Sequence, residues 1–184
     1  MTTYGAKELA AAFRTVRGNT LKIAEEIPED KYGFQPAPHT RTVGKLLTHI
    51  ALGTSFATHI HGGKITDLKT LNFPEMMTKI TAEEAKPRTK AEIIAFLTHE
   101  GEAFAAFLDG VSDAFLAERV AMPPGAEPAT KSRLEMLLSA KEHEMHHRGQ
   151  LMLIERTLGI VPHLTRQFQE RMAAHAAAPA PAAR

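Results

Sequence analysis

Apolar residues recur at alternating steps of three and four along four long segments of the chain, which is the spacing of one face of an α-helix. The first segment spans residues 6–27 and ends at Pro28. The second spans residues 46–60 and ends at a pair of glycines. The pattern therefore predicts two amphipathic helices. Their repeating positions are Ala6, Leu9, Phe13, Val16, Thr20, Ile23 and Ile27 in the first helix and Leu46, His49, Gly53, Phe56 and Ile60 in the second.

Two further helices are predicted where a capping box precedes the apolar repeat. The stretch Thr89-x-x-Glu92 begins the third helix, and a glycine at position 110 ends it. The stretch Ser132-x-x-Glu135 begins the fourth helix, which runs to about residue 159. The apolar positions are Ile93, Leu97, Phe104 and Phe107 in the third helix and, with two histidines among them, Met136, Ala140, His143, His147, Leu151, Ile154 and Leu158 in the fourth.

The connections between these segments complete the predicted architecture. Residues 64–88 show no sustained period, although Thr81-x-x-Glu84 is a capping box for a short helical turn, so we expect a long, irregular crossover between helices two and three. No alternating strand pattern occurs, and the four helices indicate an all-α four-helix bundle. We expect residues 1–172 to form this single domain, with a short amphipathic piece after Pro162, and the Ala- and Pro-rich residues 173–184 to form a disordered tail.

Composition narrows the classes of function. The chain has 184 residues, enough for one domain with its own core. Because 22 Lys and Arg balance 21 Asp and Glu, the net charge of +1 favours neither nucleic acid nor an anionic membrane as a partner. The N-terminus does not resemble a secretory signal, and no apolar run approaches the roughly 18 residues that span a bilayer. We therefore expect a soluble, cytoplasmic protein.

The absence of cysteine directs attention to histidine, because any bound metal must then be held by nitrogen and oxygen. His143 and His147 lie one turn apart on the fourth helix, where both can reach one metal ion, and His49 interrupts the apolar repeat of the second helix. Taken alone, each is better explained as a hydrogen-bonded core histidine. One divalent ion would satisfy all three, and three imidazoles with water in the remaining position form an open, reactive site.

A zinc peptidase is the competing interpretation of the same stretch. The pentapeptide HEMHH at residues 143–147 satisfies the pattern H-E-x-x-H, with Glu144 as general base and Glu170 as the third ligand. The extended form of the motif fails, because Gly149 stands one position early and residue 153 is leucine. No strand is predicted that would align an extended peptide. We therefore favour the three-histidine site and interpret Glu144 as a solvated carboxylate on the helix surface.

The stretch KEHEMHHRGQLMLIERTLGI, together with PHTRTVGKLLTHIA earlier in the chain, resembles the DinB/YfiT-like superfamily. The resemblance extends over almost the whole chain up to about residue 170. It implies a four-helix bundle that binds a divalent metal, often zinc or nickel, through one histidine of the second helix and two of an H-x-x-x-H-R-G-Q stretch on the last long helix. The matching positions here are His49, His143 and His147.

The same resemblance implies a class of reaction. Superfamily members include S-transferases that use low-molecular-weight thiols, such as bacillithiol or mycothiol, and a mycothiol-dependent maleylpyruvate isomerase. We therefore expect a metal-dependent enzyme, a thiol-dependent S-transferase acting on a small-molecule substrate, because a metal with an open position lowers the pKa of a bound thiol. The alternative is a non-catalytic, metal-stabilised bundle that binds a ligand, in which a side chain blocks the open position.

Several other positions carry secondary expectations. Gln150 is placed to orient a ligand or a metal-bound water, Glu100 to act as an acceptor or join an internal ion pair, and His39 to line the mouth of the site. The fourth helix also carries a second apolar stripe, which either packs against the C-terminal segment or forms the seam of a homodimer, and we favour the homodimer. The stripe consists of Leu134, Leu138, Met145 and Met152.

Overall fold

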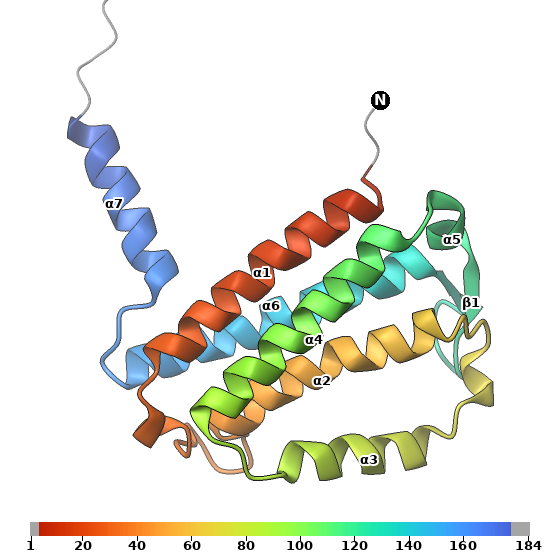
Figure 1. The fold of residues 1–184 in the computed structure, drawn as a ribbon, viewed down its shortest axis with the longest axis horizontal. Coiled ribbons are helices and arrows are strands. Elements are labelled where there is room, and N and C mark those ends of the chain that lie inside the picture. Colours follow the sequence, from red (N-terminus) through yellow and green to blue (C-terminus); the bar gives the residue numbers. More distant parts are fainter. Residues whose placement is uncertain (1–3, 178–184) are drawn as a thin grey trace, which may run out of the picture.

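The computed structural model describes residues 4–177, and within them four long helices form a bundle (Figure 1). The four are α1 (Ala6–Glu26), α2 (Val43–Gly62), α4 (Lys90–Gly110) and α6 (Arg133–Thr157). Helix α1 packs against α4 and α6, and α2 packs against the same two helices. The predicted all-α four-helix bundle is therefore confirmed. None of the helices described is both long enough and apolar enough to cross a membrane.

Contacts between helix ends establish the directions of the helices. Lys90, at the start of α4, donates a hydrogen bond to the carbonyl of Ile27 just beyond α1, so α1 and α4 are antiparallel. Arg133, at the start of α6, lies 3.2 Å from the ring of His61 at the end of α2, so these two helices are also antiparallel. Since α2 follows α1 through the short 3-10 turn η1 (Glu29–Lys31), the order is up, down, down, up. The chain must therefore return along the whole bundle between α2 and α4.

This return segment is more regular than the sequence predicts. After the turn η2 (Leu68–Thr70), helix α3 (Phe73–Ala85) runs beside α2, with the side chain of Asn72 accepting a hydrogen bond from the amide of Glu75 (Figure 1). The prediction of an irregular crossover is wrong here, and Thr81-x-x-Glu84 lies inside α3 instead of beginning a turn. No residue of α3 is buried, and its apolar positions Phe73, Met76, Met77 and Ile80 span only two turns, too few to show a sustained period.

A small hairpin closes the end of the bundle at which α6 begins. Helix α5 (Asp113–Ala117) leads into β1 (Arg119–Ala121), which pairs antiparallel with β2 (Thr130–Ser132). The sequence predicts no strand, because strands of three residues are too short to show an alternating pattern. Val120 is fully buried and faces Lys131 across the pair, so the hairpin places a lysine beside the ends of α2 and α6.

The apolar face predicted for α1 lies entirely in the core, since all seven of its repeating positions are buried. Phe13 meets Phe104 of α4 edge to face, with 4.8 Å between the ring centroids. The faces predicted for α2 and α6 are only partly in the core. On α2 the positions His49, Gly53 and Phe56 are half-buried, and the core is formed by their neighbours Leu46, Leu47, Ile50, Ala51 and Ala57.

On α6 the buried line also differs from the predicted stripe. Met136, Ala140 and His143 are half-buried, whereas Leu137 and Glu144 are buried. A carboxylate in the core is the reason for the difference, because a pattern of apolar residues gives a glutamate no weight. The interpretation of Glu144 as a solvated surface group is therefore wrong: it is 1% exposed.

The buried glutamate is held by an arginine from α1. Arg17, 4% exposed, donates from Nε to both carboxylate oxygens of Glu144, at 2.9 and 3.1 Å, and from Nη2 to Oε2 at 2.9 Å. Its Nη1 donates to the carbonyl of Leu97 on α4. Gly101 makes room for this side chain, because a Cβ there would lie 2.8 Å from Cγ of Arg17. One fully engaged guanidinium thus joins three of the four helices.

Replacing Glu144 by Gln is expected to lower the free energy of unfolding by about 3 kcal/mol, because the Arg17 charge stays buried without its counter-charge. The matched control is Glu142→Gln, two positions away on the exposed side of α6, which should change it by less than about 0.5 kcal/mol. Urea unfolding followed by circular dichroism measures both. Equal stabilities of the two variants would contradict the role assigned to the ion pair.

Helix α7 (His163–Ala177) leaves the bundle after α6 and projects away from it (Figure 1). Arg166 pairs with Glu26 at 2.6 Å, and His163 lies 3.2 Å from Asn19, so the first turn of α7 is anchored to α1. The amphipathic piece predicted after Pro162 is this helix. Residues 173–177 of the predicted disordered tail are helical, which corrects that part of the prediction, and residues 178–184 lie outside the described residues.

Glu155 lies fully buried beside this anchor, and neither of its carboxylate oxygens has a hydrogen-bond partner. Burial, reinforced by the negative charge of Glu26, raises the pKa of Glu155 to about 7. The folded protein therefore keeps this proton up to a pH of about 7, whereas the unfolded chain releases it near 4.5. The stability associated with the protonated carboxyl is complete below pH 4.5 and is lost as the pH rises through 7.

Glu155→Gln is accordingly expected to gain stability relative to the unmodified protein as the pH rises from 4.5 to above 7. The gain should reach up to about 3 kcal/mol, because the amide cannot ionise. Urea midpoints measured across this pH range for both proteins test the expectation. Glu170→Gln, on an exposed face of α7, serves as the control and should leave the difference flat. A flat difference for Glu155→Gln would show that its carboxylate is accommodated without strain.

Candidate metal centre

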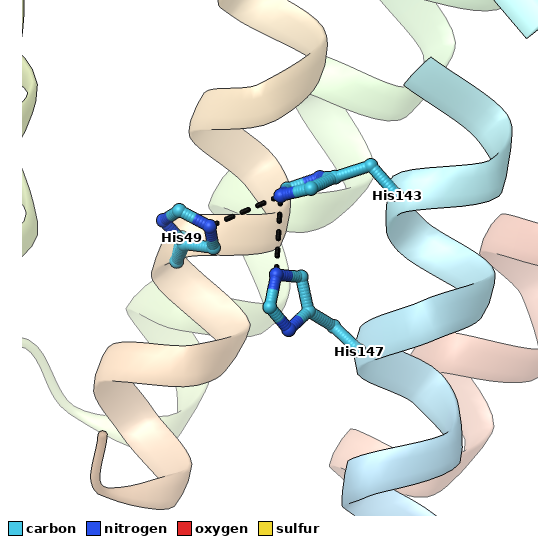
Figure 2. Close-up of side chains that lie close together, drawn as sticks. All are labelled: His49, His143 and His147. Carbon is cyan, nitrogen blue, oxygen red and sulfur yellow. Dashed lines mark hydrogen bonds between the residues drawn. The ribbon is translucent and has the colours of Figure 1, made fainter. Parts of the chain in front are cut away.

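Three histidines from two helices meet at mid-bundle between α2 and α6 (Figure 2). Nε2 of His143 lies 3.1 Å from Nε2 of His49 and 3.1 Å from Nε2 of His147. One ligand atom from each ring lies within 4.8 Å of the other two. The convergence predicted from the sequence is present in the structure, and it brings together groups separated by 94 positions in the chain.

His49 is held by a carboxylate that the sequence analysis did not assign to the site. Its Nδ1 donates to Oε2 of Glu84, at 3.1 Å, and the other oxygen of Glu84 accepts from Nε of Arg41 at 2.7 Å. A carboxylate on Nδ1 places the proton there and leaves the lone pair of Nε2 free toward the centre of the cluster. Glu84 belongs to α3. In the sequence it is the last residue of Thr81-x-x-Glu84, which predicts a helix cap and gives no indication of a contact with His49.

His147 is oriented by a neighbour on its own helix. Its Nδ1 donates to Oε1 of Gln150 at 2.8 Å, and Nε2 of Gln150 lies 3.3 Å from His146. Gln150 thus holds the ring of His147, whose Nε2 is directed to the cluster, and its role in orienting a ligand or a metal-bound water stays a prediction. His146 itself is exposed and lies outside the group of three.

His143 completes the cluster because Gly53 leaves space for its ring. A Cβ at position 53 would lie 3.0 Å from Nδ1 and 3.1 Å from Cε1 of His143, closer than such atoms normally approach. The helix α2 therefore presents a histidine and, one turn later, a gap for a second imidazole from α6. The sequence pattern places this glycine in the apolar repeat of α2. In the folded protein its lack of a side chain leaves room for the ring of His143.

All three imidazoles are kept neutral at physiological pH. Burial is the largest cause that lowers the pKa of each ring, and for His143, whose pKa falls to about 4, the neighbouring histidines add to it. The charge of Arg41 contributes to the lowering at His49. A neutral imidazole with a free lone pair is the form that binds a metal.

This arrangement fits a divalent metal. Three nitrogens bound to one tetrahedral zinc ion at ~2.1 Å lie ~3.4 Å from each other, and two of the three separations here are 3.1 Å. The outer nitrogens of His49 and His147 already have the acceptors that bound histidines usually have. Nickel also accepts imidazole nitrogen.

The zinc peptidase interpretation is not supported by this geometry. Glu144, its general base, points into the core and shares both oxygens with Arg17. Glu170, its third ligand, lies on an exposed part of α7 and is not among the residues grouped at the cluster. Glu100 accepts a hydrogen bond from the hydroxyl of Ser55 and is likewise outside the cluster.

Two cavities reach the histidines. The first, which we call the apolar cavity, has a volume of about 390 Å³, lies against α2, α3, α6 and the hairpin, and touches His49 and His143. The second, the polar cavity, has a volume of about 780 Å³ and touches His147. His39 lines the polar cavity, as the sequence predicts for the mouth of the site, together with Arg41, Lys45, Glu84 and Gln150.

Comparison with known proteins identifies the family of this chain and agrees with its fold. The sequence profile of the DinB superfamily matches residues 12–151, a span that contains all three histidines. The chain belongs to the DinB superfamily. YjoA of Bacillus subtilis is 23% identical over 154 residues, which cover 84% of this chain and 91% of YjoA.

Solved structures of other proteins share the fold of this DinB chain. The crystal structure of YjoA superimposes with a TM-score of 0.61 at 20% identity, covering 83% of this chain and 92% of YjoA. YfiT of Bacillus subtilis, described as a probable metal-dependent hydrolase with an unusual four-helix bundle topology, gives 0.66 at 12% identity and coverages of 87% and 91%. A mycothiol-dependent maleylpyruvate isomerase gives 0.61 at 14% identity, covering 82% of this chain and 63% of that protein.

Removing a histidine of the cluster is expected to remove bound metal. His49→Ala purified beside the unmodified protein should contain less than about a tenth of its metal, because two imidazoles and water bind a divalent ion far more weakly than three. Glu84→Gln should weaken metal affinity by about tenfold to a hundredfold through the loss of its hold on His49. Elemental analysis and competition with a chromogenic chelator measure the two effects.

Matched controls for this test lie on the same helices. His59→Ala removes an exposed histidine of α2, and Glu83→Gln removes a carboxylate of α3 that pairs with Lys86 and Arg88. Both should keep the metal content of the unmodified protein. Full metal content in His49→Ala would exclude the cluster as the metal site.

Proposed function

We propose that this DinB protein is a metal-dependent enzyme that transfers a low-molecular-weight thiol to a small electrophile. In this proposal His49, His143 and His147 hold a divalent ion, zinc or nickel. The observation that carries the proposal is that two cavities of different chemical character reach one cluster of neutral imidazoles. A reaction that joins two unlike substrates needs such an arrangement, because each substrate must approach the same centre from its own side.

A divalent metal on three neutral imidazoles supplies an open Lewis-acid position, where the pKa of a bound thiol is lowered. The residues of this chain provide the rest. Glu84 and Gln150 fix the rings of His49 and His147, and Arg41 keeps Glu84 in place by pairing with its other oxygen. Gly53 gives the ring of His143 its position.

The two cavities suit the two substrates. The polar cavity offers the cationic groups of Arg41 and Lys45 and the amide of Gln150 beside His147, which suits a hydrophilic thiol. The apolar cavity beside His49 and His143 suits the electrophile. In the transfer the thiol proton passes to solvent, a bond forms between sulfur and carbon, and the leaving group departs with the electron pair of its bond to that carbon.

Two other functions remain as alternatives to be tested with the same protein. A hydrolase would use water in place of the thiol, as the description of YfiT suggests for that protein. A non-catalytic bundle would bind a ligand without converting it. The thiol transferase is favoured here because a hydrolase needs only one of the two cavities.

The decisive experiment is a screen of low-molecular-weight thiols, including bacillithiol, mycothiol, glutathione and coenzyme A, against monobromobimane as a fluorogenic electrophile. We expect saturable, metal-dependent formation of the thioether with at least one thiol. His49→Ala should lower kcat/KM by at least about a hundredfold, because the thiol is then no longer activated, and His59→Ala should leave it unchanged. Parallel assays with nitrophenyl esters in the absence of thiol test the hydrolase.

Failure of every thiol with the fully metal-loaded protein, in the presence of ester hydrolysis, would replace the transferase by the hydrolase. Failure of both reactions, with metal bound and stable, would favour the non-catalytic bundle.

The predicted homodimer is a separate proposal that these assays do not test. In the proposed seam Leu138 and Met152 are partly buried within their own chain, whereas Met145 is 42% exposed.

A further inference from the structure

The apolar cavity continues from the histidine cluster to the hairpin at the end of the bundle. Its lining on α2 begins at His49 and ends at His61, twelve positions further along, which corresponds to ~18 Å of helix. Between these ends the lining is almost entirely apolar. It includes Leu52, Phe56, Ile60, Phe73, Met77 and Met136. The cavity is thus elongated, with polar groups concentrated at its two ends.

The end beside the hairpin contains a lysine that forms no salt bridge with any of the described residues. Lys131 of β2 lines the cavity and forms no salt bridge within residues 4–177. The nearby carboxylate of Glu135 is committed elsewhere: it accepts hydrogen bonds from the amide and hydroxyl of Ser132 and pairs with Arg119 at 3.2 Å. Of the residues that line the cavity, none is Asp or Glu. The ammonium group is therefore available to an anion.

A hydrogen-bond donor lies at the same end. Nη1 of Arg133 donates to Nδ1 of His61 at 3.2 Å, which makes Nδ1 the acceptor and leaves the ring proton on Nε2. Burial and the charge of Arg133 lower the pKa of His61 to about 4, so the ring stays neutral. His61 is 2% exposed and lines the cavity, and Nε2–H is the ring group left to bind a ligand there.

We propose that the apolar cavity binds an elongated apolar molecule ending in a carboxylate, with the carboxylate between Lys131 and His61 and the opposite end of the molecule beside His49 and His143. This rests on the proposed function, for which it specifies the electrophilic substrate as an anionic amphiphile. One ammonium and one neutral donor balance the single charge and the two oxygens of a carboxylate. The ~18 Å between the two polar ends requires a chain of medium length.

The test measures binding and so does not depend on turnover. Isothermal titration calorimetry with octanoate, decanoate and decanol, on the zinc-loaded and the metal-free protein, reports affinity for chain and head group separately. We expect decanoate to bind at least about tenfold more tightly than decanol, because a charge-assisted hydrogen bond to a partly desolvated ammonium is worth ~1.5 kcal/mol or more. Lys131→Met should remove this difference and leave decanol binding within about twofold of its original value.

Two further variants make the outcome specific. Lys141→Met removes a lysine of α6 that does not line the cavity and should bind decanoate as the unmodified protein does. Lys131→Glu should weaken decanoate more than Lys131→Met does, because it introduces a like charge. Lys131 is on a short strand at the surface of the bundle, and circular dichroism of both Lys131 variants verifies that the helices are intact.

Equal affinities for decanoate and decanol, or decanoate binding unaffected by either Lys131 variant, would overturn the proposal. Carboxylate binding that depends on Lys131, in a protein that transfers no thiol, would support the proposal while rejecting the transferase. Thiol transfer to an electrophile that carries a carboxylate, at a rate unaffected by either Lys131 variant, would reject the proposal and retain the transferase.

Discussion

The buried ion pair between Arg17 and Glu144 determines which way α6 faces. Successive residues of an α-helix are turned by about 100° from each other, so once Glu144 points at α1, His143 and His147 both point to one side of it, some 40° apart. That side is the one occupied by α2. A buried charge pair adds little net stability compared with apolar packing, but it penalises any rotation that separates the charges. In this protein the penalty keeps the two imidazoles directed at His49.

The up, down, down, up order of the helices has a second consequence for the site. A bundle with this order needs a connection that travels back along its own length, and here that connection contains α3. Helix α3 buries no residue, so the core does not depend on it. It instead supplies Glu84 to His49 and one wall of the apolar cavity. The segment that the topology requires as a return path thus orients one of the three histidines and encloses the space beside it.

At both ends of the apolar cavity a neighbouring side chain occupies one ring nitrogen of a histidine and leaves the other nitrogen free. At one end Glu84 occupies the outer nitrogen of His49, which leaves the inner nitrogen of that ring for the centre of the cluster. At the other end Arg133 occupies Nδ1 of His61 and leaves Nε2 for the cavity. In each case a neighbouring side chain fixes the tautomer, and the tautomer determines what the ring can bind. Polar neighbours therefore determine the chemistry of both ends.

The sequence by itself determined the four helices, the capping boxes that begin α4 and α6, and the three histidines. Periodicity records burial along a helix, and histidines at spacings of four on such a helix necessarily share a side. It also predicted seven buried positions along α1 correctly, each of them an apolar residue or a threonine, although it missed the buried Arg17 on the same helix. Where the core contains charge, as at Arg17 and Glu144, the same pattern misassigned the buried face in the first half of α6, because a count of apolar residues cannot recognise a glutamate that is neutralised by a distant arginine.

Only the tertiary structure decided which groups surround the histidines. Local sequence offers another explanation for each of these groups. It interprets Glu84 as part of a helix cap, Gly53 as part of a helix face and Arg41 as part of a loop. The hairpin that places Lys131 at the end of the cavity is too short to show a strand pattern, and the apolar positions of α3 extend over only two turns. These contacts join residues far apart in the chain, and their partners are set by the packing of whole helices, which no local spacing of residues records.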